Sequence, residues 1–178
     1  MRKLRFYILV FLITATPAFA GFAIYYKYYT AVDRGPLVRE AEKFVHQELD
    51  LSKLETVANF STPARNGNEK YWAIYMVSDC GACKKLLPLA EKVRQEPDSD
   101  LKVVGIMAES DENILRFVEE HQIKFPILRD TGAAFMKSMN LRYFPASFLV
   151  NDGIISKAFF GMPRDQETIR SFLQDQSN

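Results

Sequence analysis

Residues 80–88 of the chain read CGACKKLLP and hold both of its cysteines, in a C-x-x-C spacing. The run before them, 71–77, is rich in aromatic and β-branched residues and predicts a strand. The run after them predicts a helix that begins at Cys80 and ends near Arg94. Cys80 should therefore lie at a helix N-terminus, where free N–H groups and the helix dipole stabilise a thiolate. Because the thiolate is the nucleophile of disulfide exchange, this placement predicts redox chemistry at Cys80 and Cys83.

Two other uses of the cysteine pair have to be weighed. A structural disulfide between residues this close in sequence closes too small a loop to add much stability. A zinc site would need two further ligands, and the chain's two histidines, His46 and His121, are the candidates. We expect both histidines to be solvated surface residues. The pattern thus favours redox chemistry that needs no metal or other cofactor, with zinc binding and an inert pair as alternatives.

Strands and helices alternate from residue 71 onward. Besides the first strand and the cysteine helix, we expect strands over 101–107, 125–128, 146–150 and 154–160, and helices over 110–121, 132–140 and from Asp165 onward. Asn151-Asp152-Gly153, between the last two strands, is a hairpin turn signal. This order predicts an α/β fold, with a central mixed β-sheet that has helices on both faces.

An earlier segment, 37–49, has apolar residues at helical spacing and predicts an amphipathic helix. The pattern does not say what the apolar face of this helix contacts. We expect the helix to pack on the main domain, or else to serve as a stalk or a dimer contact.

The first 29 residues differ from the rest. Residues 1–5 contain three basic residues, and residues 6–26 contain no charge. As a helix the uncharged run is about 30 Å long, enough to cross the hydrocarbon core of a bilayer. Tyrosines at its far end suit the membrane interface, and the basic end should stay in the cytoplasm. We therefore expect a single-pass anchor in the cytoplasmic (inner) membrane, with the C-terminal part in the periplasm or outside. A signal peptide cleaved after Ala18-Phe19-Ala20 is the alternative.

Composition and charge support this division of the chain. The net charge of +1 argues against a nucleic-acid partner, which would require a basic surface. Beyond Lys27 the chain carries 19 basic and 22 acidic residues, so the outer part is mildly acidic. Two cysteines cannot form a disulfide scaffold, and 48% hydrophobic residues exclude disorder. We divide the chain into a membrane anchor or signal segment (1–29), a connector with the amphipathic helix (30–68) and the main domain (69–178).

Two stretches resemble the thioredoxin superfamily. CGACKKLLP at 80–88 is similar to the family's active-site helix, including the proline five residues after the second cysteine. LRYFPASFLV at 141–150, followed by the turn at 151–153, is similar to the segment that carries the family's cis-proline. The resemblance implies a thioredoxin-like fold in which Pro145 is cis, faces the active-site sulfurs and lies beside backbone that pairs with an extended substrate chain. The substrate-binding residues that we expect are Gly81, Ala82, Phe144 and Pro145.

The 61 residues between Cys83 and Pro145 leave room for an inserted strand-helix unit at about 103–128. This insertion, the anchor and the exported domain are similar to the membrane-anchored TlpA/ResA group. Residues 83–88, 119–122 and 125–126 are also similar to the methylamine dehydrogenase accessory protein MauD. The resemblance implies a membrane-tethered reductase that exchanges disulfides with exported client proteins, for example in cytochrome c or metalloprotein maturation. It also implies re-reduction by a membrane electron donor.

The sequence departs from these families around the cysteines. Asp79 stands in place of the usual tryptophan, and its charge opposes thiolate formation at Cys80 unless it points to solvent. Ile74 and Leu86 stand where thioredoxin and ResA-like proteins carry an acid that can accept the proton of the second cysteine. Two alternatives therefore stay open: a dithiol oxidant, and a client-binding or chaperone module with little redox activity.

Overall fold

The computed structural model describes residues 35–59, 69–96, 100–163 and 165–174. The main compact unit of the chain is Leu37–Asn178. The predicted membrane segment, 6–26, lies outside the described residues. Among the residues that are described, we find no helix with the length and apolar character needed to cross a membrane.

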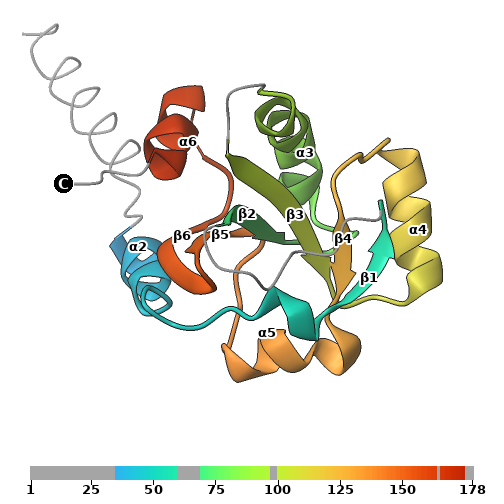
Figure 1. The fold of residues 1–178 in the computed structure, drawn as a ribbon, viewed down its shortest axis with the longest axis horizontal. Helices are drawn as coiled ribbons and strands as arrows, with labels where there is room; N and C mark the ends of the chain where they lie inside the picture. Colours follow the sequence, from blue (N-terminus) through green and yellow to red (C-terminus); the bar gives the residue numbers. More distant parts are fainter. Residues whose placement is uncertain (1–34, 60–68, 97–99, 164, 175–178) are drawn as a thin grey trace, which may run out of the picture. The chain divides into compact units, whose positions relative to one another are not determined.

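The described residues form one six-stranded mixed sheet (Figure 1). In spatial order its strands are β1 (Glu55–Ala58), β4 (Ile127–Arg129), β3 (Leu101–Met107), β2 (Lys70–Tyr75), β5 (Ala146–Asn151) and β6 (Ile154–Phe160). β2, β3 and β4 run parallel, whereas β1, β5 and β6 pair antiparallel with their neighbours. The prediction of a central mixed sheet is therefore confirmed.

Helices cover both faces of this sheet, as predicted (Figure 1). One face carries α3 (Gly81–Arg94), α4 (Asp111–Glu120) and α6 (Gln166–Leu173), and the other carries α2 (Gly35–Glu42) and α5 (Ala134–Ser138). Because side chains alternate along a strand, Ile74 of β2 packs on the first face with Cys83, and Tyr75 packs on the second. We call the first the cysteine face and the second the tyrosine face.

Several local predictions are confirmed. The inserted unit is β3–α4–β4, and Pro88 lies inside α3 without ending it. The hairpin between β5 and β6 turns at Asp152 and Gly153, with φ of 52° and 78°, the left-handed conformation that a two-residue hairpin turn requires. Asp165 caps α6, because its Oδ1 accepts the N–H of Thr168 at 2.7 Å.

The prediction of an amphipathic helix over 37–49 is wrong beyond Glu42, where α2 ends. The chain turns at His46, with φ 69°, and then pairs with β6. His46 N–H donates to Ile155 O at 2.8 Å, and Ile155 N–H donates to Gln47 O at 2.9 Å. The backbone thus exchanges helical hydrogen bonds for sheet hydrogen bonds, while the apolar positions Ala41, Phe44 and Leu49 are still buried on the tyrosine face. We had expected this segment to pack on the main domain, to form a stalk or to make a dimer contact, and the structure shows that it packs on the domain.

β1 is an element that we did not predict. It is only four residues long, and one of them, Ala58, is buried. It pairs antiparallel with β4, which lies about 70 residues further along the chain. A strand this short, defined by a distant partner, has too little periodicity to be recognised in the sequence.

Candidate active site

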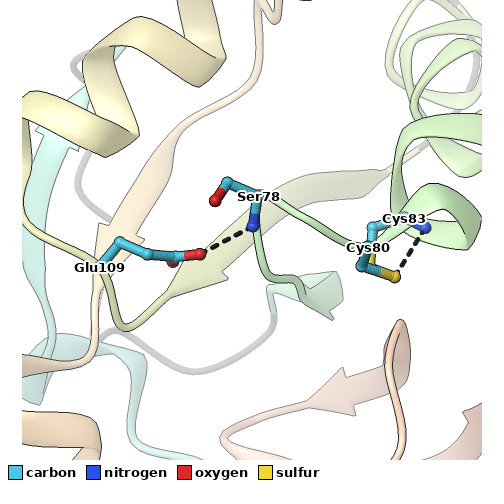
Figure 2. Close-up of a disulfide and its surroundings, with 4 residues drawn as sticks. All are labelled: Ser78, Cys80, Cys83 and Glu109. Carbon is cyan, nitrogen blue, oxygen red and sulfur yellow. Dashed lines mark hydrogen bonds between the residues drawn. A yellow bond between two sulfur atoms is a disulfide. The ribbon is translucent and has the colours of Figure 1, made fainter.

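Cys80 lies where we predicted, as the N-cap of α3 (Figure 2). Its Sγ accepts the N–H of Cys83 at 3.0 Å, and its carbonyl oxygen accepts the N–H of Lys84 at 3.1 Å. The sulfur is therefore held against the free N–H groups of a 14-residue helix. Cys80 and Cys83 are joined by a disulfide, with their Cα atoms 5.2 Å apart.

The two cysteines differ in their access to solvent. Cys83 is completely buried, whereas Cys80 is half-buried. Gly81, next to Cys80, is exposed, and a Cβ placed on it would meet no atom within 4 Å. Asp79 is exposed too, so its charge is solvated beside Cys80. The open surface at residues 79–81 leaves room for another chain to approach Cys80.

The surroundings of Cys83 are apolar. It packs with Ile74 and Leu86, which are 0% and 1% exposed. These are the two positions at which thioredoxin and ResA-like proteins carry an acid that can accept the proton of the second cysteine. Among the described residues, the buried polar or charged ones are Asp130 and Ser147. Ser147 is the cross-strand partner of Ile74 and its hydroxyl makes no hydrogen bond in the described structure. In the described part of the chain, the cysteine face therefore carries a buried hydroxyl at Ser147 and no carboxylate residue as deeply buried as Asp130.

The Phe144–Pro145 bond is cis, as we expected from the resemblance. Pro145 is buried and its carbonyl oxygen accepts the N–H of Gly161 at 2.8 Å. Phe144 is half-buried and packs against the core of both faces. Cys80 packs against the cluster of the cysteine face as well, so the structure brings Phe144 and Cys80 to the same apolar cluster. That Pro145 faces the sulfurs stays a prediction.

Sequence reasoning missed a buried polar network on the tyrosine face. Tyr75 Oη donates to Asp130 Oδ2 at 2.7 Å, and Asp130 also accepts the N–H groups of Phe135 and Met136 at 2.8 and 2.9 Å. The Tyr75 ring stacks on Phe135 and lies 5.7 Å from the ring of Phe144. Burial raises the pKa of Tyr75, and the hydrogen bond to Asp130 raises it further, so the phenol stays a donor. An aspartate just before a helix is a recognisable signal, but nothing in the sequence pairs it with Tyr75.

The histidines differ from each other. His46 is exposed, as predicted, but His121 packs edge-on against Phe117 at 4.6 Å, and its Nε2 is buried without a hydrogen-bond partner in the described residues. The prediction that His121 is a solvated surface residue is therefore wrong, because its ring packs on the preceding turn of α4 and is half-buried. Within the described ranges, no three His, Cys, Asp or Glu side chains gather as a metal site would require.

The fold and the paired cysteines together define the class of the protein: it is a thioredoxin-like thiol-disulfide oxidoreductase. The sequence model of the Redoxin family matches residues 37–173. The chain belongs to that family.

Known proteins resemble this chain along most of its length. The thiol-disulfide oxidoreductase ResA of Bacillus thuringiensis subsp. konkukian (strain 97-27) is 25% identical over 177 residues, which cover 98% of either chain. The crystal structure of StoA from Bacillus subtilis is 27% identical, with a TM-score of 0.51, over 61% of this chain and 85% of that one. A thiol-disulfide isomerase from Corynebacterium glutamicum, 22% identical, superposes with a TM-score of 0.61 over 76% of this chain and 99% of that one, which shows the shared fold.

Proposed function

We propose that this protein is a membrane-tethered reductase that exchanges disulfides with exported client proteins. The observation that carries the proposal is the position of Cys80 at the N-terminus of α3, half-exposed above the buried Cys83. The helix end stabilises the Cys80 thiolate in the reduced protein, which makes Cys80 the nucleophile near neutral pH. Burial keeps Cys83 away from solvent and from other proteins, so it reacts only with the sulfur of Cys80.

The exchange proceeds in two steps. The Cys80 thiolate attacks one sulfur of a client disulfide, which forms a mixed disulfide and releases a client thiolate that takes up a proton. Cys83 then loses its proton and attacks the Cys80 sulfur, which forms the Cys80–Cys83 disulfide and releases the second client thiol. Two electrons pass to the client, and a membrane dithiol donor returns two electrons to the protein. The disulfide in the structure corresponds to the end of this reaction.

The client binds beside the cysteines in this proposal. Gly81 is open to solvent next to Cys80 and is followed by the half-buried Ala82, while Phe144, which precedes Pro145, packs on the same apolar cluster as Cys80. The uncharged segment 6–26, with basic residues before it, supports a membrane anchor and an outward-facing domain. Reduction of haem-ligating or metal-ligating cysteines of exported proteins, as in cytochrome c maturation, is the duty that the resemblance favours.

A trapping experiment tests this proposal. The full chain carrying Cys83→Ala is expressed in its own membrane and the free thiols are blocked by alkylation. Because the resolving cysteine is missing, we expect mixed disulfides with exported proteins in the membrane fraction, released by dithiothreitol. The matched control is the double variant Cys80→Ala with Cys83→Ala, which should trap nothing. If the single and double variants give the same pattern, the exchange proposal fails.

One observation favours a second candidate, a client-binding module with little redox activity. Both positions from which an acid could take the Cys83 proton are buried apolar residues, Ile74 and Leu86. Reduction of insulin disulfides by the wild-type protein decides between the two. The reductase proposal expects turnover that is lost in Cys80→Ser, whereas the binding module expects no turnover and client binding that survives Cys80→Ser.

A further inference from the structure

Glu109 contacts the loop that leads to Cys80. It follows β3, in the connection to α4, and is half-buried. Its Oε1 accepts the backbone N–H of Ser78 at 2.7 Å. Its Oε2 is buried and makes no hydrogen bond within the described residues. Figure 2 shows the carboxyl group directed at the backbone of Ser78, with the two cysteines further along the same chain segment.

The loop between β2 and α3 is short, so the position of Ser78 affects that of Cys80. Cys80 N–H donates to Val77 O at 3.1 Å, which closes a tight turn over Ser78 and Asp79. Beyond this turn, Cys80 Sγ accepts the N–H of Cys83. A shift of Ser78 would turn Cys80 relative to the first turn of α3. The stabilisation of its thiolate depends on that alignment, because the effect of a helix end fades within one turn.

The Glu109 carboxylate also lies close to the end of β2. Burial raises the pKa of Tyr75, and the charges of Asp130 and Glu109 raise it further. Tyr75 is the last residue of β2, directly before the segment that carries Cys80. The Glu109 carboxylate therefore lies near the end of the sheet from which the chain leaves for the active site. The hydrogen bond to Ser78 is its described contact there.

We propose that Glu109 is a positioning residue for disulfide exchange, whose carboxylate holds Cys80 at the N-terminus of α3 through the N–H of Ser78. The inference rests on the proposed function, since it assigns a role in that reaction. Glu109 touches neither sulfur and transfers no proton in this account. Its effect is on the free energy of the Cys80 thiolate, and hence on the balance between the dithiol and the disulfide.

Two variants of the full chain, Glu109→Gln and Glu109→Ala, test the proposal. Both remove the charge, but glutamine keeps an oxygen that can accept the Ser78 N–H and alanine does not. The equilibrium of the Cys80–Cys83 pair with glutathione is measured at one pH near 7. We expect the equilibrium constant for reduction to be about tenfold lower in the alanine variant than in the glutamine variant, which is about 30 mV for a two-electron couple. The reason is that a misaligned helix end stabilises the Cys80 thiolate less, so the reduced form is less favoured.

The control is Glu112→Ala, which removes an exposed carboxylate from the first turn of α4. It should leave the equilibrium at the wild-type value. If the alanine and glutamine variants agree within twofold, the proposal is overturned, even where both are less stable than the wild type. If Glu109→Ala does not fold, Glu109→Asp is compared with the wild type. It keeps the charge and shortens the reach, so a decrease supports the proposal and an unchanged equilibrium overturns it. The assay uses glutathione and no client, so its outcome is independent of the trapping experiment.

Discussion

The two faces of the sheet differ in how far their buried polar groups are hydrogen-bonded. On the cysteine face, Cys83 is packed among apolar side chains, and the buried Ser147 hydroxyl and Trp72 Nε1 have no hydrogen-bond partner within the described residues. On the tyrosine face, Asp130 is 1% exposed, yet it accepts three hydrogen bonds. The protein thus buries a carboxylate that is hydrogen-bonded to Tyr75 at the end of β2, on the face away from Cys83.

This difference indicates what the buried carboxylate does. A charge is tolerated inside a protein when its hydrogen-bonding capacity is met, and Asp130 meets it with Tyr75 and the start of α5. Tyr75 in turn contacts Phe144, directly before the cis-proline. The tyrosine face therefore supports the predicted client-binding loop, and the cysteine face keeps the resolving cysteine in an apolar setting.

The largest effect is expected from breaking the network on the tyrosine face with Asp130→Ala. The free energy of unfolding should fall by about 4 kcal/mol, because three donors lose their acceptor and each costs about 1–3 kcal/mol when buried and unpaired. Urea unfolding, followed by the fluorescence of the single tryptophan, measures this change. Asp130→Asn, which keeps one acceptor oxygen, should lose about half as much. A loss below about 1 kcal/mol for the alanine variant would show that the network does not hold the tyrosine face together.

A second variant places a carboxyl group on the cysteine face. Ile74→Asp should cost about 3 kcal/mol at pH 7, because a buried carboxylate needs several donors and the hydroxyl of its cross-strand partner Ser147 supplies one at most. Burial should raise its pKa above the value in the unfolded chain. Stability is then greatest below the unfolded pKa and is lost as pH rises through the raised folded pKa. The unfolding free energy should therefore fall between about pH 4 and pH 7.

The matched control for this variant is Ile74→Asn, which has the same shape and no charge. Its stability should not show the additional decrease with rising pH. In the chain that keeps Cys83, the aspartate should also speed resolution of the mixed disulfide relative to asparagine, because it can accept the Cys83 proton. Parallel stability curves for the two variants would mean that the site around Cys83 is wetter than its burial indicates.

The sequence predicts the elements whose signal is local. The cysteine helix, β3 and the β5–β6 hairpin have periodic apolar residues together with a cap or a turn residue, and they lie where expected. The helix over 37–49 failed after Glu42 because its apolar spacing also suits a chain that turns and pairs with β6. β1 was missed because its partner β4 is distant in the sequence.

In the candidate site, too, the local features could be predicted from the sequence and the long-range contacts could not. The spacing of Cys80 and Cys83 and the segment around Pro145 can be read from short stretches of sequence. The supporting contacts cannot, because Tyr75 and Asp130 are 55 residues apart and Ser78 and Glu109 are 31 apart. The sequence around Asp130 and Glu109 does not indicate which residue each of them contacts, because both pairs form only through tertiary packing. Periodicity predicts which face a residue lies on, but it does not predict which polar groups meet there.

A smaller effect is expected from Tyr75→Phe, which removes one hydrogen bond and keeps the ring. Asp130 retains its two backbone donors, so the free energy of unfolding should fall by only about 1 kcal/mol. The ring contact with Phe144 persists, and exchange with a peptide disulfide should keep its rate. Urea unfolding and a peptide exchange assay measure the two quantities. A cost as large as that of Asp130→Ala would mean that the phenol, and not the backbone of α5, is the partner that matters.

The smallest effect should come from Trp72→Phe on the cysteine face. Trp72 is 0% exposed, and its Nε1 is buried without a hydrogen-bond partner among the described residues. Removing an unpaired donor offsets part of the cost of the cavity left by the smaller ring, so the net change should stay within about 1 kcal/mol. Urea unfolding is followed by circular dichroism, because the fluorescent tryptophan is removed. Trp72→Ala is the control for side-chain volume, and its free energy of unfolding should fall by about 4 kcal/mol. If Trp72→Phe costs as much as Trp72→Ala, the indole nitrogen contributes to the cysteine face. If the cost is small, that face depends on apolar volume alone, in contrast to the hydrogen-bonded tyrosine face.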